Sequence, residues 1–153
     1  MDRGIVKSGC LIALGLCLTE ISLVGCGPTG PQVFPVQGKV TLTDGTPIAY
    51  GHVILNPDKA KGNLSLEVCQ GTIQNGSYII MTGARPGAPL GAYTVAIEAA
   101  KDVDPKNPYF TEWLADEKYI DPTRSKLTLE VVKNPEPGRY DFKLDPHPPQ
   151  KAP

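Results

Sequence analysis

Apolar and polar residues alternate along much of the chain from residue 36 onward, and this period of two constrains the fold more than any other feature. In "VQGKVTLT", one side of the segment carries only small or apolar residues, which are Val36, Gly38, Val40 and Leu42. Successive side chains of a β-strand point to opposite faces of a sheet. The segment therefore predicts a strand with one buried face.

The same alternation recurs later, so we expect further strands in "GHVILNP", "LEVCQGTI", "GSYIIMT", "AYTVAIEA", "KLTLEVV" and "RYDFKL". The side chains expected to face the core are those of Val53, Leu55, Ile73, Tyr78, Ile80, Tyr93, Val95, Ile97, Leu127, Leu129, Val131, Tyr140, Phe142 and Leu144. Seven short strands with turns between them predict an all-β fold, an antiparallel seven-stranded β-sandwich.

Two pairs of turn residues connect predicted strands. Asp44–Gly45 follows the first strand, and "GHVILNP" is expected as the returning strand. Asn75–Gly76 lies between two alternating runs. Because asparagine, aspartate and glycine tolerate positive φ, the second pair predicts a tight hairpin.

The N-terminal segment has the three parts of an export signal. Arg3 and Lys7 give a basic start, Gly9–Leu18 is an apolar middle of ten residues, and small residues follow. A membrane-spanning helix needs roughly 20 apolar residues, so the middle is short for an anchor. An uncleaved helix over residues 8–25 is an alternative, but it would place the Glu20 carboxylate near lipid at a high cost.

The end of this segment resembles the bacterial lipobox, in which a cysteine thiol receives a diacylglyceryl group and the signal is cut before it. The matching residues are Leu23, Val24, Gly25 and Cys26. Cys26 is thus the predicted lipidation site, acylated for example with palmitate. Two or more acyl chains give a stable membrane anchor, since each buried CH₂ adds about 0.8 kcal/mol. Gly27 stands where an inner-membrane retention aspartate would be, which favours the outer membrane. Ordinary secretion is the remaining alternative.

These features divide the chain into four parts: a signal peptide (1–25), a tether (26–35), a β-domain (36–145) and a proline-rich tail (146–153) that should be extended and mobile. The net charge of −1 gives no electrostatic footprint for nucleic acid. Once Cys10 and Cys17 leave with the signal and Cys26 carries lipid, Cys69 is alone, which excludes an intramolecular disulfide. We expect Cys69 to be a small buried residue of a strand.

The order of these segments is similar to that of small lipoproteins of planctomycete bacteria that carry a carboxypeptidase-regulatory-like, or transthyretin-like, domain. The resemblance covers residues 36–144, and its most specific parts are "VQGKVTLTDGTP" and "EKYIDPTRSKLTLEV". It implies a transthyretin-like or immunoglobulin-like β-sandwich in the cell envelope. It brings no catalytic residues.

Residue patterns for catalysis or metal binding are mostly missing from the sequence. A zinc carboxypeptidase needs several histidine and glutamate ligands, whereas His52 and His147 are the two histidines and are expected at the surface. Asp102, Asp104 and Asn107 are spaced for calcium, but two prolines break the EF-hand pattern. The chain also lacks the C-terminal "YRGS" of transthyretin-like hydroxyisourate hydrolases. We therefore expect no cofactor, no metal and no enzyme activity, with a small hydrolase as a weak alternative.

Residues 101–125 are too long for an ordinary connection and contain the aromatic cluster "YFTEWLADEKY". Tyr109, Phe110 and Trp113 form a possible surface for an envelope protein or a polysaccharide. Alternatively, the cluster folds over one end of the core as a lid, with a helical turn or two. The sequence thus predicts a lipid-anchored, noncatalytic interaction or structural module, and a carbohydrate-binding module using Tyr109–Tyr119 is the alternative.

Overall fold

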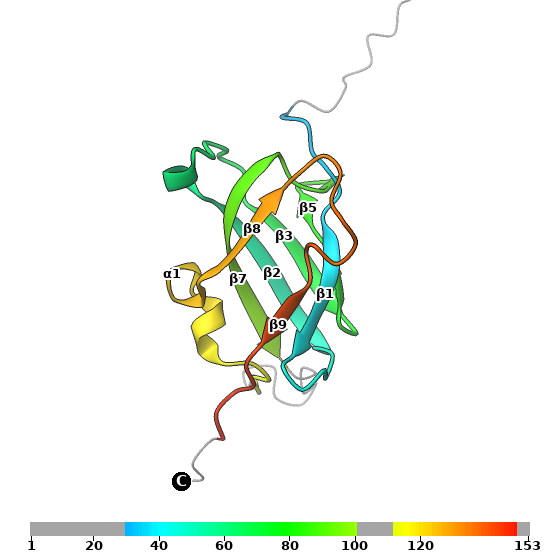
Figure 1. Cartoon of the computed structure of the whole chain (residues 1–153), viewed down its shortest axis with the longest axis vertical. Coiled ribbons are helices and arrows are strands. Elements are labelled where there is room, and N and C mark those ends of the chain that lie inside the picture. The colour runs from blue at the N-terminus through cyan, green and yellow to red at the C-terminus, as the bar shows by residue number, and fades with distance from the viewer. Residues whose placement is uncertain (1–29, 101–111, 150–153) are drawn as a thin grey trace, which may run out of the picture. The chain divides into compact units, whose positions relative to one another are not determined.

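A computed structural model describes residues 30–100 and 112–149, and this part of the chain is an all-β domain (Figure 1). Its strands form one sheet in the order β8-β7-β2-β3-β4-β1-β9, and the short β5 pairs with β3 and β6. The strands are β1 (Gln37–Leu42), β2 (Tyr50–Pro57), β3 (Cys69–Gln74), β4 (Ser77–Ile79), β5 (Met81–Thr82), β6 (Arg85–Pro86), β7 (Gly91–Ala100), β8 (Leu127–Val131) and β9 (Phe142–Leu144). Three short helices are η1 (Lys59–Lys61), η2 (Glu117–Ile120) and α1 (Pro122–Ser125).

The sheet curls until β1 and β9 lie in front of β2 and β7 (Figure 1), and side chains from both parts fill one core. The predicted inward face of each strand is confirmed. Among the apolar residues assigned to the core, all are buried except Leu127, which is half-buried. Alternation therefore identifies the buried faces correctly, because one face of the curled sheet is shielded from water.

The tight hairpin at Asn75–Gly76 is also confirmed. Both residues have positive φ, 49° and 77°, and they join β3 to β4. Ile73 faces Tyr78 across the pair, so the turn fixes a register in which both side chains enter the core.

The prediction of a wholly antiparallel, seven-stranded sheet is wrong in two respects. β1 and β9 pair in parallel, with Val40 opposite Phe142. The run predicted as one strand after the hairpin is divided, because Ile80 leaves the ladder between β4 and β5, and β5 pairs with the additional β6. The described residues consequently contain nine strands in a mixed sheet.

The strand that follows the Asp44–Gly45 turn does not pair with β1. The turn brings only residues 46–48 back to β1, where Thr41 and Pro47 form an isolated bridge and the Ile48 N–H lies 3.1 Å from the carbonyl of Val40. β2 then pairs with β3 and β7, while β1 pairs with β4 and β9. Both edges of β1 are thus occupied by other strands, and alternation alone carries no information about which strands share an edge.

The described part of the C-terminal tail is packed against the domain. Pro146 forms a bridge with Ala115, and the His147 N–H lies 2.8 Å from the carbonyl of Leu114. The prediction of a mobile tail is therefore wrong for residues 146 and 147. The tail runs on from β9 at one end of the domain, whereas residues 31–34 lie at the other end (Figure 1).

Candidate functional site

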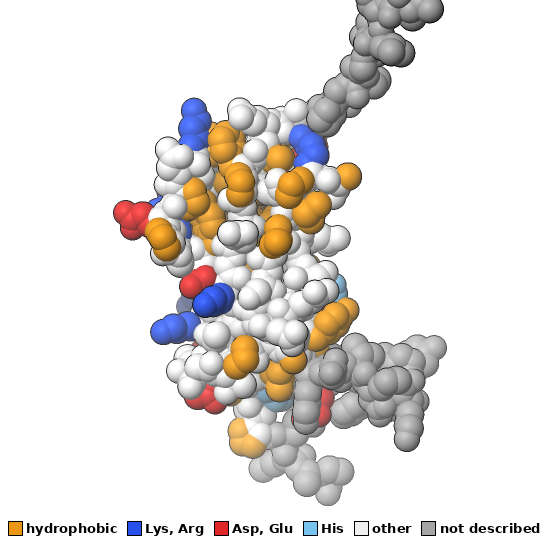
Figure 2. All heavy atoms as spheres, turned by 90° about the vertical axis from the view of Figure 1, so that its right-hand side faces the viewer, with side chains coloured by type: hydrophobic (Ala, Val, Ile, Leu, Met, Phe, Trp, Pro, Cys, Tyr) orange, Lys and Arg blue, Asp and Glu red, His pale blue; other side chains and the backbone are white. Residues whose placement is uncertain are grey.

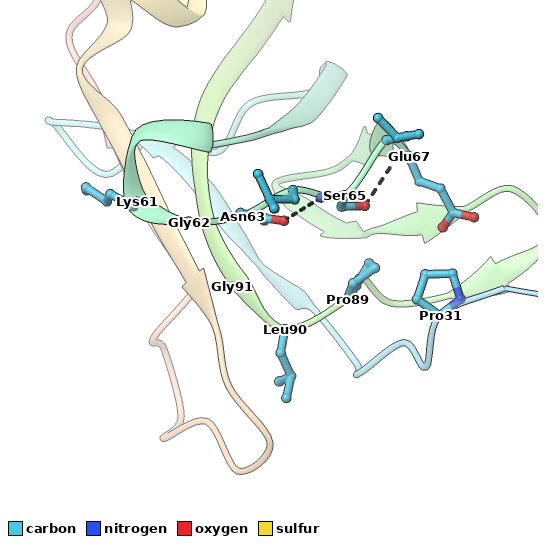
Figure 3. A pocket seen from close by; sticks show the side chains of 11 residues that line it. Pro31, Lys61, Gly62, Asn63, Ser65, Glu67, Pro89, Leu90 and Gly91 are labelled. Carbon is cyan, nitrogen blue, oxygen red and sulfur yellow. Dashed lines mark hydrogen bonds between the residues drawn. The ribbon is translucent and has the colours of Figure 1, made fainter.

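A groove of about 550 Å³ lies at the end of the domain where residue 31 enters it (Figure 3). We call it the leucine groove, and its lining comes from Pro31, residues 61–67 and residues 89–91. Leu66 is 91% exposed, Leu64 76% and Leu90 41%. Full burial of a leucine side chain stabilises a fold by roughly 1.5–3 kcal/mol. Large apolar side chains gathered at a protein surface are typical of interaction sites.

The segment of residues 63–68 turns its polar side chains toward the protein. Asn63 is buried, and its side-chain amide donates a hydrogen bond of 2.9 Å to a backbone carbonyl of β7. The Asn63 side-chain oxygen accepts from the Ser65 N–H at 3.1 Å, and the Ser65 hydroxyl accepts from the Glu67 N–H at 3.3 Å (Figure 3). The alternate residues, which are all exposed, are Leu64, Leu66 and Val68.

Arg85 joins the two sides of the leucine groove. One guanidinium nitrogen donates to both carboxylate oxygens of Glu67, at 2.9 and 3.1 Å, and the other donates to the carbonyl of Pro31 at 2.5 Å. Charge-assisted bonds of this kind are stronger than neutral ones and fix geometry. The groove is therefore formed before anything binds in it.

A pair of lysines lies beside the leucines, on η1. Asp58 caps this short helix by accepting from the N–H groups of Ala60 and Lys61. The Lys61 ammonium lies 3.8 Å from the Asp58 carboxylate, and Lys59 occupies the same turn. Lys61 therefore borders the leucine groove, with Lys59 in the same turn. Apolar side chains also gather on another face of the domain, toward its upper end in Figure 2.

The aromatic cluster is only partly within the described residues. Tyr109 and Phe110 lie outside them, and Trp113 is half-buried in a bridge with Ala100 at the end of β7. Tyr119 is buried in the core, which agrees with the lid alternative for this residue. The helical turn predicted around residues 109–114 falls partly outside the described residues, and Trp113 lies in a bridge instead. The described helical turns, η2 and α1, lie further along the chain.

The two histidines lie at the surface as predicted. His52 is on β2 with its Nδ1 3.4 Å from the Glu98 carboxylate, and the His147 Nε2 lies 3.5 Å from Glu117. In residues 30–100 and 112–149, no three His, Cys, Asp or Glu side chains gather closely enough to hold a metal ion. The calcium-type residues Asp102, Asp104 and Asn107 lie outside this part, as do the lipobox residues Leu23, Val24, Gly25 and Cys26.

Cys69 is a fully buried residue of β3, as predicted. Burial raises the pKa of its thiol, since the thiolate would lose its hydration, and a hydrogen bond from the Thr82 hydroxyl at 3.2 Å opposes this shift. The thiol is therefore a packing group of the core.

No protein-family model matches the sequence, and no curated protein or solved structure matches it. Among the described residues, no helix is long and apolar enough to cross a membrane. The resemblance seen in the sequence stays a prediction.

Sequence reasoning missed the leucine groove, although a signal for it was present. The segment "NLSLEVC" alternates strictly, and Cys69 faces the core. Counting back from Cys69 in steps of two places Glu67, Ser65 and Asn63 on the inward face of the segment. The residues between them, Leu64, Leu66 and Val68, then face outward. The sequence predicts a strand over "LEVCQGTI" instead, whereas β3 begins only at Cys69.

Proposed function

We propose that this chain is a lipid-anchored, noncatalytic protein of the cell envelope whose β-domain is an interaction module. The lipobox at Leu23–Cys26 carries the proposal. The leucine groove supports it, because the groove includes Pro31 and so belongs to the end of the domain that the tether enters.

We also propose that the curled sheet is a transthyretin-like sandwich in which β1 and β9 form a layer over β2, β3 and β7. The shared core supports this assignment, since Val40 and Leu144 pack in one cluster with Val53 and Ile97. The same proposal places the protein at the outer membrane, facing the periplasm or the exterior, because Gly27 follows the acylated cysteine.

The mass of the N-terminal peptide from the membrane fraction tests the anchor. We expect a peptide that begins at Cys26 and carries acyl chains in the native chain, and we expect both features to be lost in Cys26→Ser. A native chain that keeps an unacylated N-terminus at Met1 or Asp2 would show that the segment is not processed as a lipoprotein signal.

A further inference from the structure

We propose that the leucine groove rests on the lipid bilayer that holds the acyl chains of Cys26, so that the domain lies against the membrane through Leu64, Leu66 and Leu90. The inference rests on the proposed lipid anchor. It adds a second contact with the bilayer, made by the folded domain itself, and it fixes which end of the domain faces the lipid.

The length of the tether limits how far this end can be from the membrane. Pro31 is five positions after Cys26. Fully extended, these five steps of the chain span at most about 17 Å. Pro31 itself lines the leucine groove, and its carbonyl is held by Arg85. Anchoring at Cys26 therefore keeps the groove next to the lipid headgroups.

The chemistry of the groove fits the interfacial region of a bilayer. Leu64 and Leu66 are held outward, because the polar residues beside them are bonded to the protein side of the segment. Amphipathic surfaces that lie in a membrane interface combine such apolar side chains with lysines at their edge. Lys59 and Lys61 of η1 supply these cations for anionic headgroups.

The opposite end of the domain is too far away to share this contact. β7 runs from Gly91, in the groove, to Ala100, which bridges to Trp113. A ten-residue strand is about 30 Å long. Trp113 and the lid around Tyr119 therefore point away from the bilayer when the leucine groove faces it.

Tryptophan fluorescence tests the orientation, because Trp113 is the single tryptophan of the chain. The full-length lipidated chain and its Leu66→Trp variant are purified from membranes and reconstituted into vesicles of phosphatidylethanolamine and phosphatidylglycerol. These lipids carry bromine on acyl carbons near the headgroup, and bromine quenches a nearby indole.

We expect a loss of tryptophan emission from Leu66→Trp and little change in the emission of the unsubstituted chain. Ile79→Trp, at another exposed apolar position, is the matched control and should keep its emission.

Flotation of the same vesicles separates failure of the anchor from failure of this inference. If the unsubstituted chain does not float with the vesicles, the lipid anchor is wrong and the inference falls with it. If it floats but Leu66→Trp is not quenched, the anchor stands and the orientation is wrong. Crosslinking of residue 66 to a protein in native membranes, in place of quenching, would assign the groove to a protein partner and would also overturn the inference.

Hydrogen exchange tests the same contact without a substitution in the leucine groove. We expect slower exchange in residues 64–68 on vesicles than in detergent-free Cys26→Ser protein, with no change around Trp113. Equal exchange at residues 64–68 in the two samples would contradict contact with lipid.

Discussion

The Tyr119 hydroxyl donates a hydrogen bond to the Asp145 carboxylate at 3.0 Å and accepts one from the Asp145 N–H at 3.1 Å. Tyr119 belongs to η2, and Asp145 directly follows β9, so these two bonds join the lid to the end of the sheet. The adjacent Lys118 ammonium lies 2.6 Å from the same carboxylate. The lid closes the core through this polar contact as well as through apolar packing.

Tyr119→Phe removes both hydrogen bonds and keeps the buried ring. We expect the free energy of unfolding to fall by about 1–2 kcal/mol, since the N–H of Asp145 also loses its partner. Urea unfolding of the full chain measures the change. Tyr50→Phe, on the half-exposed outer side of β2, is the matched control and should change stability little. Equal stability of Tyr119→Phe and the native chain would show that packing alone holds the lid.

Acid should weaken the same contact. Hydrogen bonds from Lys118 and Tyr119 hold the pKa of the Asp145 carboxyl below its ordinary value of 3.8. A lowered folded-state pKa adds stability above the unfolded pKa, and that stability is lost as the pH falls through the folded pKa. Between about pH 7 and about pH 3, the native chain should therefore lose more stability than Asp145→Asn.

Lys118→Met controls this acid effect, because it removes the largest cause of the lowered pKa and keeps Asp145. Its loss of stability in acid should lie closer to that of Asp145→Asn. Identical pH profiles for the native chain and both variants, measured by urea unfolding, would show that Asp145 contributes nothing to acid sensitivity.

Two glycines with similar backbone angles should respond differently to alanine. Gly45 has φ 91° with open space around an added Cβ, whereas Gly76 has φ 77° and its added Cβ would lie 2.7 Å from the Pro47 Cβ. We expect Gly45→Ala to reduce the free energy of unfolding by about 1–2 kcal/mol through strain in φ. Gly76→Ala should lose about 1–3 kcal/mol more through overpacking. Equal losses in the two variants would show that Pro47 moves aside without cost.

The buried faces could be predicted from the sequence, and the sheet order could not. Alternation in residues 36–43 correctly placed Val40 in the core, because burial on one face imposes a period of two. The partner of a strand depends on contacts between distant segments. The parallel pairing of Val40 with Phe142 joins residues about a hundred positions apart, and no local pattern encodes it.

The candidate site was hard to predict for a different reason. Leu64, Leu66 and Val68 resemble core residues by type, and their outward direction depends on hydrogen bonds of Asn63 and Ser65. Such bonds appear only once Asn63 is placed against β7. The inward direction of Cys69 was the one local indication that these leucines face outward. Using it required extending the alternation to residues that precede the start of β3.

Thiol labelling of the folded chain tests which side chains are buried and which are exposed in the segment that leads into β3. Cys69 is fully buried with a raised pKa, so little thiolate forms and reagent has little access. Iodoacetamide should leave Cys69 unmodified in the native state and modify it in urea.

In Leu66→Cys, the new thiol at a 91% exposed position should be modified at once in the native state. Mass spectrometry of the peptide that contains both positions identifies the labelled residue. Rapid labelling of Cys69 in the folded chain, or protection of Leu66→Cys in the membrane-free Cys26→Ser background, would show that the alternation of residues 63–69 has the opposite phase.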